Sequence, residues 1–173
     1  FFGWQSLDPE NDASLSQIES KVACHSMKTQ SNTSEYEFTT DTSRMDIDII
    51  HGYLRQSYWS PDIAREVVER AIDGSICFGI FDQAKQIGFA RVVTDKATFA
   101  YLADVFILEP HRGKGLSKQL MKIILEHPDL QGLRRFLLAT RDAHGLYQKF
   151  DFTELGNPAR FMELHRPKAY RLF

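Results

Sequence analysis

The stretch His111-Arg-Gly-Lys-Gly-Leu-Ser117 lies between two regular patterns. Residues 101–108 before it form an apolar run typical of a buried strand, and residues 118–126 after it have helical periodicity. The start of a helix offers N–H groups without intrahelical partners, together with the positive end of the helix dipole. The two glycines let the backbone approach an anion closely, and Arg112 and Lys114 would add positive charge. The stretch therefore predicts a site for phosphate groups.

Two familiar phosphate-binding loops do not fit this stretch. The nucleoside-triphosphate loop requires the pattern GxxxxGK[ST], which is absent from the sequence. The dinucleotide-binding fingerprint requires a third glycine, but Lys118 stands at that place. A simpler alternative is that Gly-Lys-Gly is only a turn that starts a helix, and the surrounding sequence has to decide between the two.

From residue 35 onward, strand and helix patterns follow one another. Apolar runs and alternation predict strands at 35–40, 76–82, 86–95, 99–108, 134–141 and 161–164. Further helices are predicted at 45–54, at 61–73 with Ser60 as N-cap and Gly74 at its end, and at 142–150 with Asp142 as its cap. A hairpin followed by strands that are joined through helices predicts an α/β protein with a mixed sheet.

Composition narrows the class of protein. A net charge of -2 and an isoelectric point near 6.3 give no basic excess for binding nucleic acid. Apolar runs are far shorter than the ~20 residues of a membrane span, and the first residues do not resemble a secretory signal, so we expect a cytoplasmic protein. Cys24 and Cys77 show no paired spacing, so neither a disulfide framework nor a metal site is indicated.

The chain is expected to contain one domain. Its 173 residues suffice for one good core. Residues 1–34, rich in Ser and Thr toward their end, read as an N-terminal extension, in which Leu15, Ile18 and Val22 have the spacing of a short helix. Residues 35–173 would then form the domain.

Two motifs together resemble the GNAT superfamily of acyl-CoA N-acyltransferases. Arg112 to Ser117 resembles the R/Q-x-x-G-x-G/A motif, with Ser117 in place of the last Gly or Ala. Further on, Ala143, Leu146, Tyr147 and Phe152 resemble the signature A-x-x-L-Y-x-x-x-G-F, with Asp151 in place of its glycine, where a left-handed backbone is often needed. The resemblance covers about residues 35 to 165 and agrees with the order of the predicted elements.

The resemblance implies a fold and a cofactor. The fold is a central, mostly antiparallel sheet with flanking helices, in which the strand before the glycine loop splays away from the next strand. The cofactor is acetyl-CoA, and its pantetheine arm would pair with strand backbone near Ile107 and Leu108. Its diphosphate would bind the backbone amides of Arg112, Gly113, Lys114, Gly115, Leu116 and Ser117.

The resemblance also implies transfer of an acetyl group to a primary amine. Tyr147 matches the residue that hydrogen-bonds the cofactor sulfur and acts as general acid. In water, however, a phenol of pKa ~10 would protonate a thiolate of pKa ~8.5 uphill by about 2 kcal/mol, so Tyr147 could donate a hydrogen bond rather than a proton. A general base, or a chain of water molecules, must also remove a proton from the amine.

Two side chains are candidates for that base. Asp104 lies in an apolar strand, where desolvation would raise the pKa of its carboxyl group, although it could equally be a structural carboxylate satisfied by backbone or by Arg91. His144, at the start of the short helix, is the second candidate. Cys77 has no neighbouring cation or histidine and is expected to be an inert core residue.

The acceptor pocket is expected between the first two helices, where Tyr58 and Trp59 could form an aromatic wall. The acceptor would be a small-molecule or peptide amine, and the protein could form a homodimer, as members of this superfamily often do. The alternative function is a non-catalytic acyl-CoA-binding module, which would need the glycines but neither Tyr147 nor a base.

Overall fold

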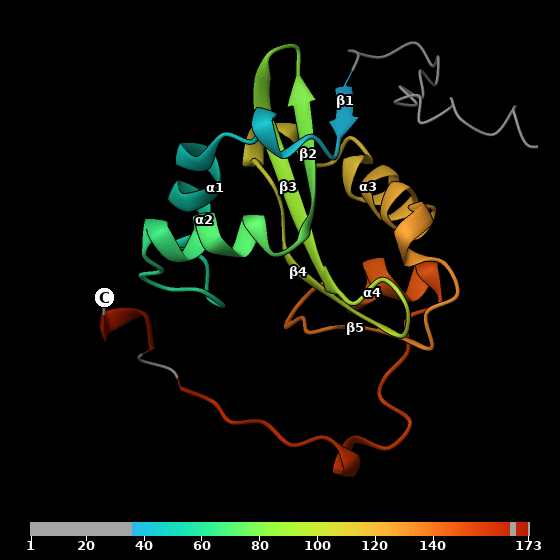
Figure 1. The fold of residues 1–173 in the computed structure, drawn as a ribbon. Helices are drawn as coiled ribbons and strands as arrows, with labels where there is room; N and C mark the ends of the chain where they lie inside the picture. Colours follow the sequence, from blue (N-terminus) through green and yellow to red (C-terminus); the bar gives the residue numbers. More distant parts are fainter. Residues whose placement is uncertain (1–35, 167–168, 173) are drawn as a thin grey trace, which may run out of the picture. The chain divides into compact units, whose positions relative to one another are not determined.

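The computed structural model describes residues 36–166 and 169–172, and its centre is a five-stranded sheet in the order β1-β2-β3-β4-β5 (Figure 1). The strands are β1 (Tyr36–Thr39), β2 (Ile76–Asp82), β3 (Lys85–Thr94), β4 (Phe99–Ile107) and β5 (Arg135–Leu138). Neighbouring strands are antiparallel except β4 and β5, which are parallel. The predicted mixed, mostly antiparallel sheet is confirmed. The predicted extension and its short helix lie outside the described residues.

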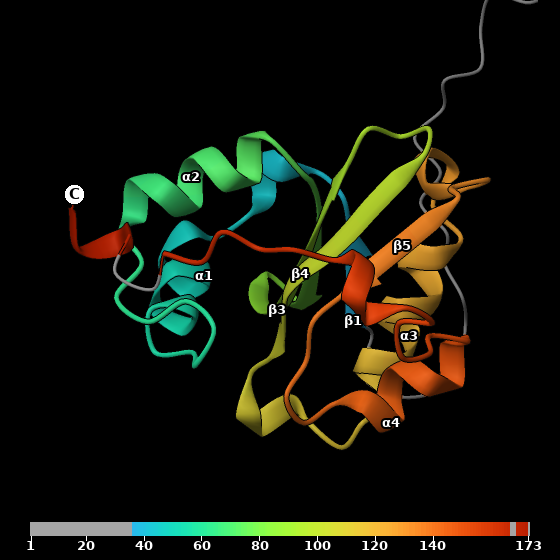
Figure 2. The same cartoon turned by 90° about the horizontal axis from the view of Figure 1, so that it is seen from below.

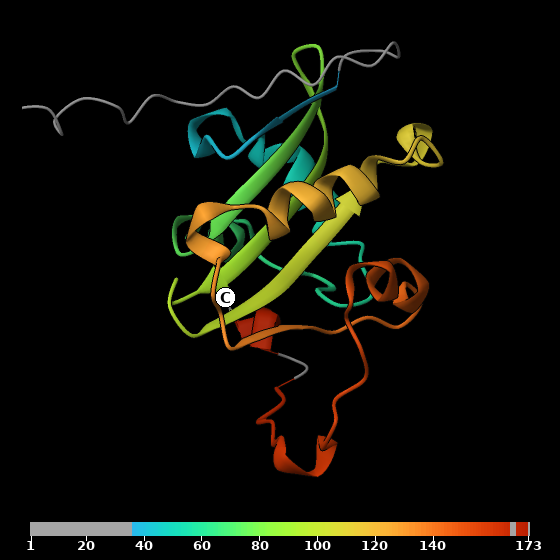
Figure 3. The ribbon, with the colours of Figure 1, turned by 90° about the vertical axis from the view of Figure 1, so that its right-hand side faces the viewer.

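Helices cover both faces of the sheet (Figure 2). They are α1 (Ile47–Leu54), α2 (Arg65–Asp73), α3 (Leu116–Leu125) and α4 (His144–Tyr147). Because side chains alternate along a strand, each strand contributes to two cores. Phe78 of β2 packs in the same cluster as α3 and α4, whereas Cys77 beside it packs with α1 and α2. Figure 3 shows α3 lying across its face of the sheet.

The predicted helix ends are right in part. The carboxylate of Asp46 accepts a hydrogen bond from the Ile49 N–H at 3.1 Å, which caps α1, and α2 ends at Gly74 as predicted. The predicted start of α2 is wrong, because Asp62 has a left-handed backbone (φ 60°) that a helix beginning at Pro61 could not contain. The Ser60 N–H instead donates to the Ser57 hydroxyl within the loop before α2.

The cap predicted for the last helix is also wrong. The Ala143 N–H donates to the hydroxyl of Thr140 at 3.0 Å, whereas the carboxylate of Asp142 lies 3.4 Å from the guanidinium of Arg141. Ala143 is thus the N-cap residue of α4, and no side chain caps the first turn of this helix.

The predicted closing strand at residues 161–164 does not form. These residues have no ladder partner, and after α4 the chain runs as an extended segment (Figure 3). Phe161 packs under the guanidinium of Arg135, with 5.0 Å from Cζ to the ring centroid, whereas Met162 and Leu164 are 97% and 80% exposed. The alternation of apolar residues there is real, but a strand also needs a neighbouring edge to pair with.

Strand β5 is paired along its whole length, but it covers only the first part of β4. Their register runs from Phe99 opposite Arg135 to Leu102 opposite Leu138, and β4 then continues to Ile107 without β5. The predicted splayed strand pair is therefore present. The backbone of β4 beyond Leu102 leads directly to the glycine loop.

Candidate functional site

The glycine loop has the backbone geometry of an anion site. Gly113 and Gly115 have φ angles of 77° and 81°, which L-residues rarely adopt, and a Cβ added to either would meet no atom within 4 Å. Gly115 is the N-cap residue of α3. Within residues 36–166, the backbone N–H groups of residues 113–117 donate no hydrogen bond to the protein. Five successive donors are thus left for a ligand at the start of α3.

The two cations of the loop hold it against the rest of the domain. Arg112 Nε donates to the Ile107 carbonyl at 2.9 Å, and its terminal nitrogen donates to the Tyr53 hydroxyl at 3.2 Å. Lys114 Nζ donates to the Tyr36 hydroxyl at 2.8 Å. These contacts fix the loop between β1, β4 and α1, and direct contact of either side chain with phosphate stays a prediction.

The end of β4 is where the pantetheine arm was predicted to pair. Here the Leu108 N–H donates to the Ile87 carbonyl at 2.8 Å, and the Leu108 carbonyl accepts from the His111 N–H at 2.9 Å. The carbonyls of Ile107 and Leu108 therefore each have one partner, and each keeps a second lone pair. Pairing of a ligand with these two residues remains a prediction.

A β-bulge interrupts β4 just beyond the point where β5 leaves it. Phe89 lies opposite Phe106 and Arg91 opposite Ala103, so Ala90 alone faces two residues, Asp104 and Val105. Asp104 has a φ of 54°, an unusual value for a residue inside a strand. The bulge directs the Asp104 side chain toward the face covered by α1 and α2.

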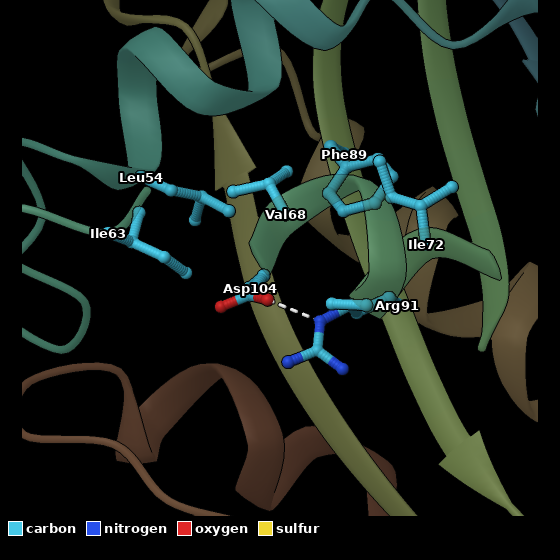
Figure 4. A pocket seen from close by; sticks show the side chains of 8 residues that line it. Leu54, Ile63, Val68, Ile72, Phe89, Arg91 and Asp104 are labelled. Carbon is cyan, nitrogen blue, oxygen red and sulfur yellow. Dashed lines mark hydrogen bonds and ion pairs between the residues drawn. The ribbon is translucent and has the colours of Figure 1, made fainter. Parts of the chain in front are cut away.

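The carboxylate of Asp104 is buried and engaged on both oxygens. Arg91 forms an ion pair with Oδ2, and the indole Nε1 of Trp59 donates to Oδ1 at 3.0 Å. Figure 4 shows the Asp104–Arg91 pair beside aliphatic side chains of α1 and α2, around a cavity of about 10 Å³. That volume holds about one water molecule and no substrate. Contact with Arg91 is the structural alternative that the sequence left open, and a role of Asp104 as base stays a prediction.

The aromatic wall was predicted from two residues of the α1–α2 loop, Tyr58 and Trp59, and this loop contacts the β5–α4 loop. Tyr58 and Trp59 are 45% and 38% exposed, and their rings meet edge to face at 4.9 Å. The guanidinium of Arg141 covers the Tyr58 ring at 3.8 Å, and the Arg141 N–H donates to the Tyr58 hydroxyl at 3.1 Å. These contacts join the two loops beside β4.

Tyr147 has a buried ring with an available hydroxyl. The residue is 8% exposed, and its ring lies edge to face with Phe152 at 6.0 Å. Burial, with smaller contributions from Tyr58 and Asp142, raises the pKa of the Tyr147 phenol to about 12. The hydroxyl makes no hydrogen bond to the described residues, among which no fully enclosed polar side-chain atom lacks a partner. It therefore reaches the surface and can donate to a ligand.

Other predicted residues lie as follows. His144 is exposed at the first position of α4, and its role stays a prediction. Asp151 has a φ of 63°, which confirms the left-handed conformation expected at that place. The Cys77 thiol is buried, and this burial raises its pKa to about 12, as befits an inert core residue. Nowhere in the described ranges do three or more His, Cys, Asp or Glu side chains gather as metal ligands, and no helix there could cross a membrane.

Tyr53 is a site residue that the sequence did not reveal. Its ring stacks on Phe106 of β4 with 4.0 Å between centroids, and its hydroxyl binds Arg112. It thereby connects α1 with both the bulged strand and the glycine loop. The sequence pattern did not indicate this position, because an aromatic residue next to Leu54 in a helix is equally compatible with ordinary packing in the core.

Comparison with known proteins agrees with this geometry. The model of the acetyltransferase (GNAT) family matches residues 41–152. A protein of Gibberella zeae named "Putative acetyltransferase" is 31% identical over 138 residues, which cover 66% of this chain and 77% of that protein. A crystal structure from Xanthomonas campestris pv. campestris, described as a "putative acetyltransferase belonging to the GNAT family", is 52% identical, with a TM-score of 0.77 over 79% of this chain and 96% of the other.

A more distant structure shares the fold. It comes from Clostridium acetobutylicum and is described as a predicted acetyltransferase with acetyl-CoA. It is 12% identical to this chain, with a TM-score of 0.55 over 76% of this chain and 95% of its own.

Proposed function

The chain belongs to the acetyltransferase (GNAT) family, and we propose that it transfers an acetyl group from acetyl-CoA directly to a primary amine of a small molecule or peptide. The observation that carries this proposal is the row of unpaired N–H groups at residues 113–117, which lies next to the splayed end of β4. A diphosphate supplies several oxygens within reach of such a row. Acetyl-CoA, the proposed acetyl donor, carries such a diphosphate.

The residues of the loop fit such a ligand. Both glycines present open backbone with no side chain between the amides and the solvent. Arg112 and Lys114 place two positive charges beside those amides, although each is already anchored by its own hydrogen bonds. The loop would therefore bind the diphosphate chiefly through its backbone, with the two cations adding longer-range attraction.

Tyr147 is proposed to stabilise the leaving thiolate. A thiolate of pKa ~8.5 facing a phenol of pKa about 12 would be protonated uphill by about 5 kcal/mol, which is more than in water. Because burial makes proton transfer so costly, we propose that Tyr147 acts by donating a hydrogen bond to the sulfur. A proton from solvent would complete the reaction.

A base must act on the amine, since an amine with a pKa near that of lysine is almost wholly protonated at pH 7. Asp104 has both oxygens in hydrogen bonds to Arg91 and Trp59, whereas the imidazole of His144 is exposed. Each Asp104 oxygen keeps lone pairs beyond these contacts, but the carboxylate is buried beside a cavity too small for a substrate, and a base must lie within reach of the proton that it removes. We therefore favour His144, or a chain of water molecules, for this step.

Calorimetric titration with acetyl-CoA, ATP and NAD tests the cofactor class. We expect binding of acetyl-CoA alone. Tight binding of ATP without acetyl-CoA would refute the proposal. A thiol-release screen over amines, amino acids, polyamines and peptides then identifies the acceptor, and binding without any release of thiol would favour the non-catalytic acyl-CoA-binding module.

Replacement of Tyr147 by Phe tests the chemical step. A hydrogen bond to a charged group contributes about 1.5 to 3 kcal/mol, so kcat should fall by about 10- to 150-fold while the affinity for acetyl-CoA stays nearly the same. Tyr101→Phe is the matched control, because it removes a partly exposed phenol of β4. Equal kcat values for the wild type and the Tyr147→Phe variant would remove Tyr147 from the catalytic machinery.

A further inference from the structure

Asp104 occupies an unusual position for a residue of a central strand. It combines a positive φ with a buried, charged side chain, and both features cost free energy unless the surroundings favour them. The β-bulge provides the conformation, since it adds one residue to β4 opposite Ala90 and bends the strand there. Such a combination points to a role that an ordinary strand residue could not fill.

The partners of the Asp104 carboxylate come from two different parts of the fold. Arg91, on the neighbouring strand β3, pairs with Oδ2 and also reaches the Ser75 hydroxyl at 3.3 Å. Trp59, in the loop between α1 and α2, donates to Oδ1. One carboxylate oxygen is thus fixed by the sheet, and the other fixes the loop.

The loop carries Tyr58 and Trp59, and its own hydrogen bonds order its backbone, such as those from the Asp62 N–H to the Arg55 carbonyl and from the Ser60 N–H to the Ser57 hydroxyl. Residues 55–64 contain no helix or strand. Trp59 touches Tyr58 edge to face, and Tyr58 in turn contacts Arg141 of the β5–α4 loop. A contact chain therefore runs from Asp104 through Trp59 and Tyr58 to the segment that leads into Tyr147.

We propose that Asp104 is a positioning residue for the amine acceptor, which holds the α1–α2 loop through Trp59 and does not take the proton. This inference rests on the proposed function for its kinetic consequences, but the contact itself does not depend on that function. Charged and titratable groups near the carboxylate are Arg91, Cys77 and Tyr101. Arg91 is the cation that pairs with the carboxylate and anchors it to β3.

Two variants separate positioning from proton transfer. Trp59→Phe keeps an aromatic ring and leaves the Arg91–Asp104 pair intact, but removes the N–H donor. Asp104→Asn keeps an acceptor oxygen but removes the charge. In both we expect the KM for the amine to rise by roughly tenfold, with a smaller change in kcat and an unchanged KM for acetyl-CoA. The effects of the double variant should be less than additive, because both changes act on the same hydrogen bond.

The pH profile of kcat/KM distinguishes the two roles, because a positioning residue and a general base predict opposite results for Asp104→Asn. If Asp104 positions the loop, the acidic limb of the profile stays in Asp104→Asn. If Asp104 were the general base, Asp104→Asn would lose that acidic limb and its rate would fall by about 10² to 10⁴. The losses in rate of Asp104→Asn and Trp59→Phe would then add in the double variant. Loss of the acidic limb in Asp104→Asn, or additive losses in the double variant, would overturn the inference. Should Asp104→Asn fail to fold, an unchanged amine KM in Trp59→Phe would overturn it as well.

A spectroscopic arm is independent of turnover. The chain has two tryptophans, Trp4 and Trp59, so the indole N–H resonance of Trp59 is the one that disappears in Trp59→Phe. We expect this resonance to move upfield in Asp104→Asn, because a neutral acceptor makes a weaker hydrogen bond. An unmoved resonance sinks the inference even if acetyl transfer is observed. If the wild type transfers no acetyl group, the proposed function fails, and the shift still decides whether Asp104 holds Trp59.

Discussion

Glycines serve opposite purposes in two regions of this molecule. In the loop, Gly113 and Gly115 are needed for their backbone conformation and have open space around them. In the β2–β3 hairpin, a Cβ at Gly88 would lie 2.8 Å from Ile107 Cδ1, 2.9 Å from Ile80 Cδ1 and 3.0 Å from the Phe106 carbonyl oxygen. The strand glycine is needed for close packing. The same residue type therefore leaves an open backbone in one region and permits close packing in the other, and only its surroundings tell which.

Gly88→Val should give the largest effect. Its side chain would collide with two isoleucine methyl groups and with a backbone oxygen that cannot move without disturbing β4. We expect a loss of about 3 kcal/mol in the free energy of unfolding, at the upper end for an overpacked core. Urea denaturation followed by circular dichroism measures it.

Gly52→Ala is the control for this first prediction. Gly52 lies inside α1, and a Cβ added there meets no atom within 4 Å. Alanine should therefore stabilise the protein, by up to about 1 kcal/mol, through its higher helix propensity. If Gly88→Val were as stable as the wild type, the contrast between packed and open glycines would be wrong.

Gly115→Ala should give an intermediate effect on stability and a specific one on binding. A left-handed conformation costs an L-residue about 1 to 2 kcal/mol, so the free energy of unfolding falls by that amount. If the loop relaxes to avoid this strain, recovering the binding geometry costs the same, which weakens the affinity for acetyl-CoA by about tenfold. Calorimetric titration measures that affinity.

Gly132→Ala matches this change at a place away from the loop. Gly132 also has a positive φ, of 70°, and open space around its Cα. The stability loss should therefore be similar, but the affinity for acetyl-CoA should stay the same. Equal loss of affinity in both variants would mean that the loop conformation has no special part in binding.

The same contrast shows what the sequence could and could not predict. The spacing of Gly113 and Gly115 predicted a tight turn between a strand and a helix, because that signal is local, whereas the prediction of a phosphate site also needed the second motif around Tyr147. The pattern of residues 161–164 was also local, but a strand depends on a partner that lies elsewhere, and the prediction there was wrong.

Asp104 illustrates the limit for the site. Its burial could be predicted from the apolar run around it, and Arg91 was named as one possible partner. The β-bulge and the contact with Trp59 could not be predicted, because both depend on how β3 and the α1–α2 loop align with β4. The start of α2 failed for a related reason: Ser60 and Pro61 have the composition of a helix start, but the left-handed Asp62 follows them.

Burial of Cys77 also makes a prediction with pH, and this dependence appears only in alkaline solution because the thiol stays protonated in both the folded and the unfolded chain at neutral pH. Burial raises the pKa of the Cys77 thiol from 9.0 to about 12; Asp104 and Asp73 raise it further by smaller amounts, and the positive charge of Arg91 opposes the shift. The unfolded chain therefore loses this proton first as the pH rises. The contribution of the protonated thiol to stability is complete below pH 9 and is lost as the pH approaches 12. The difference in unfolding free energy between the wild type and Cys77→Ala, measured by urea denaturation, should narrow between pH 9 and pH 11. A constant difference over that range would mean that the thiol is open to solvent.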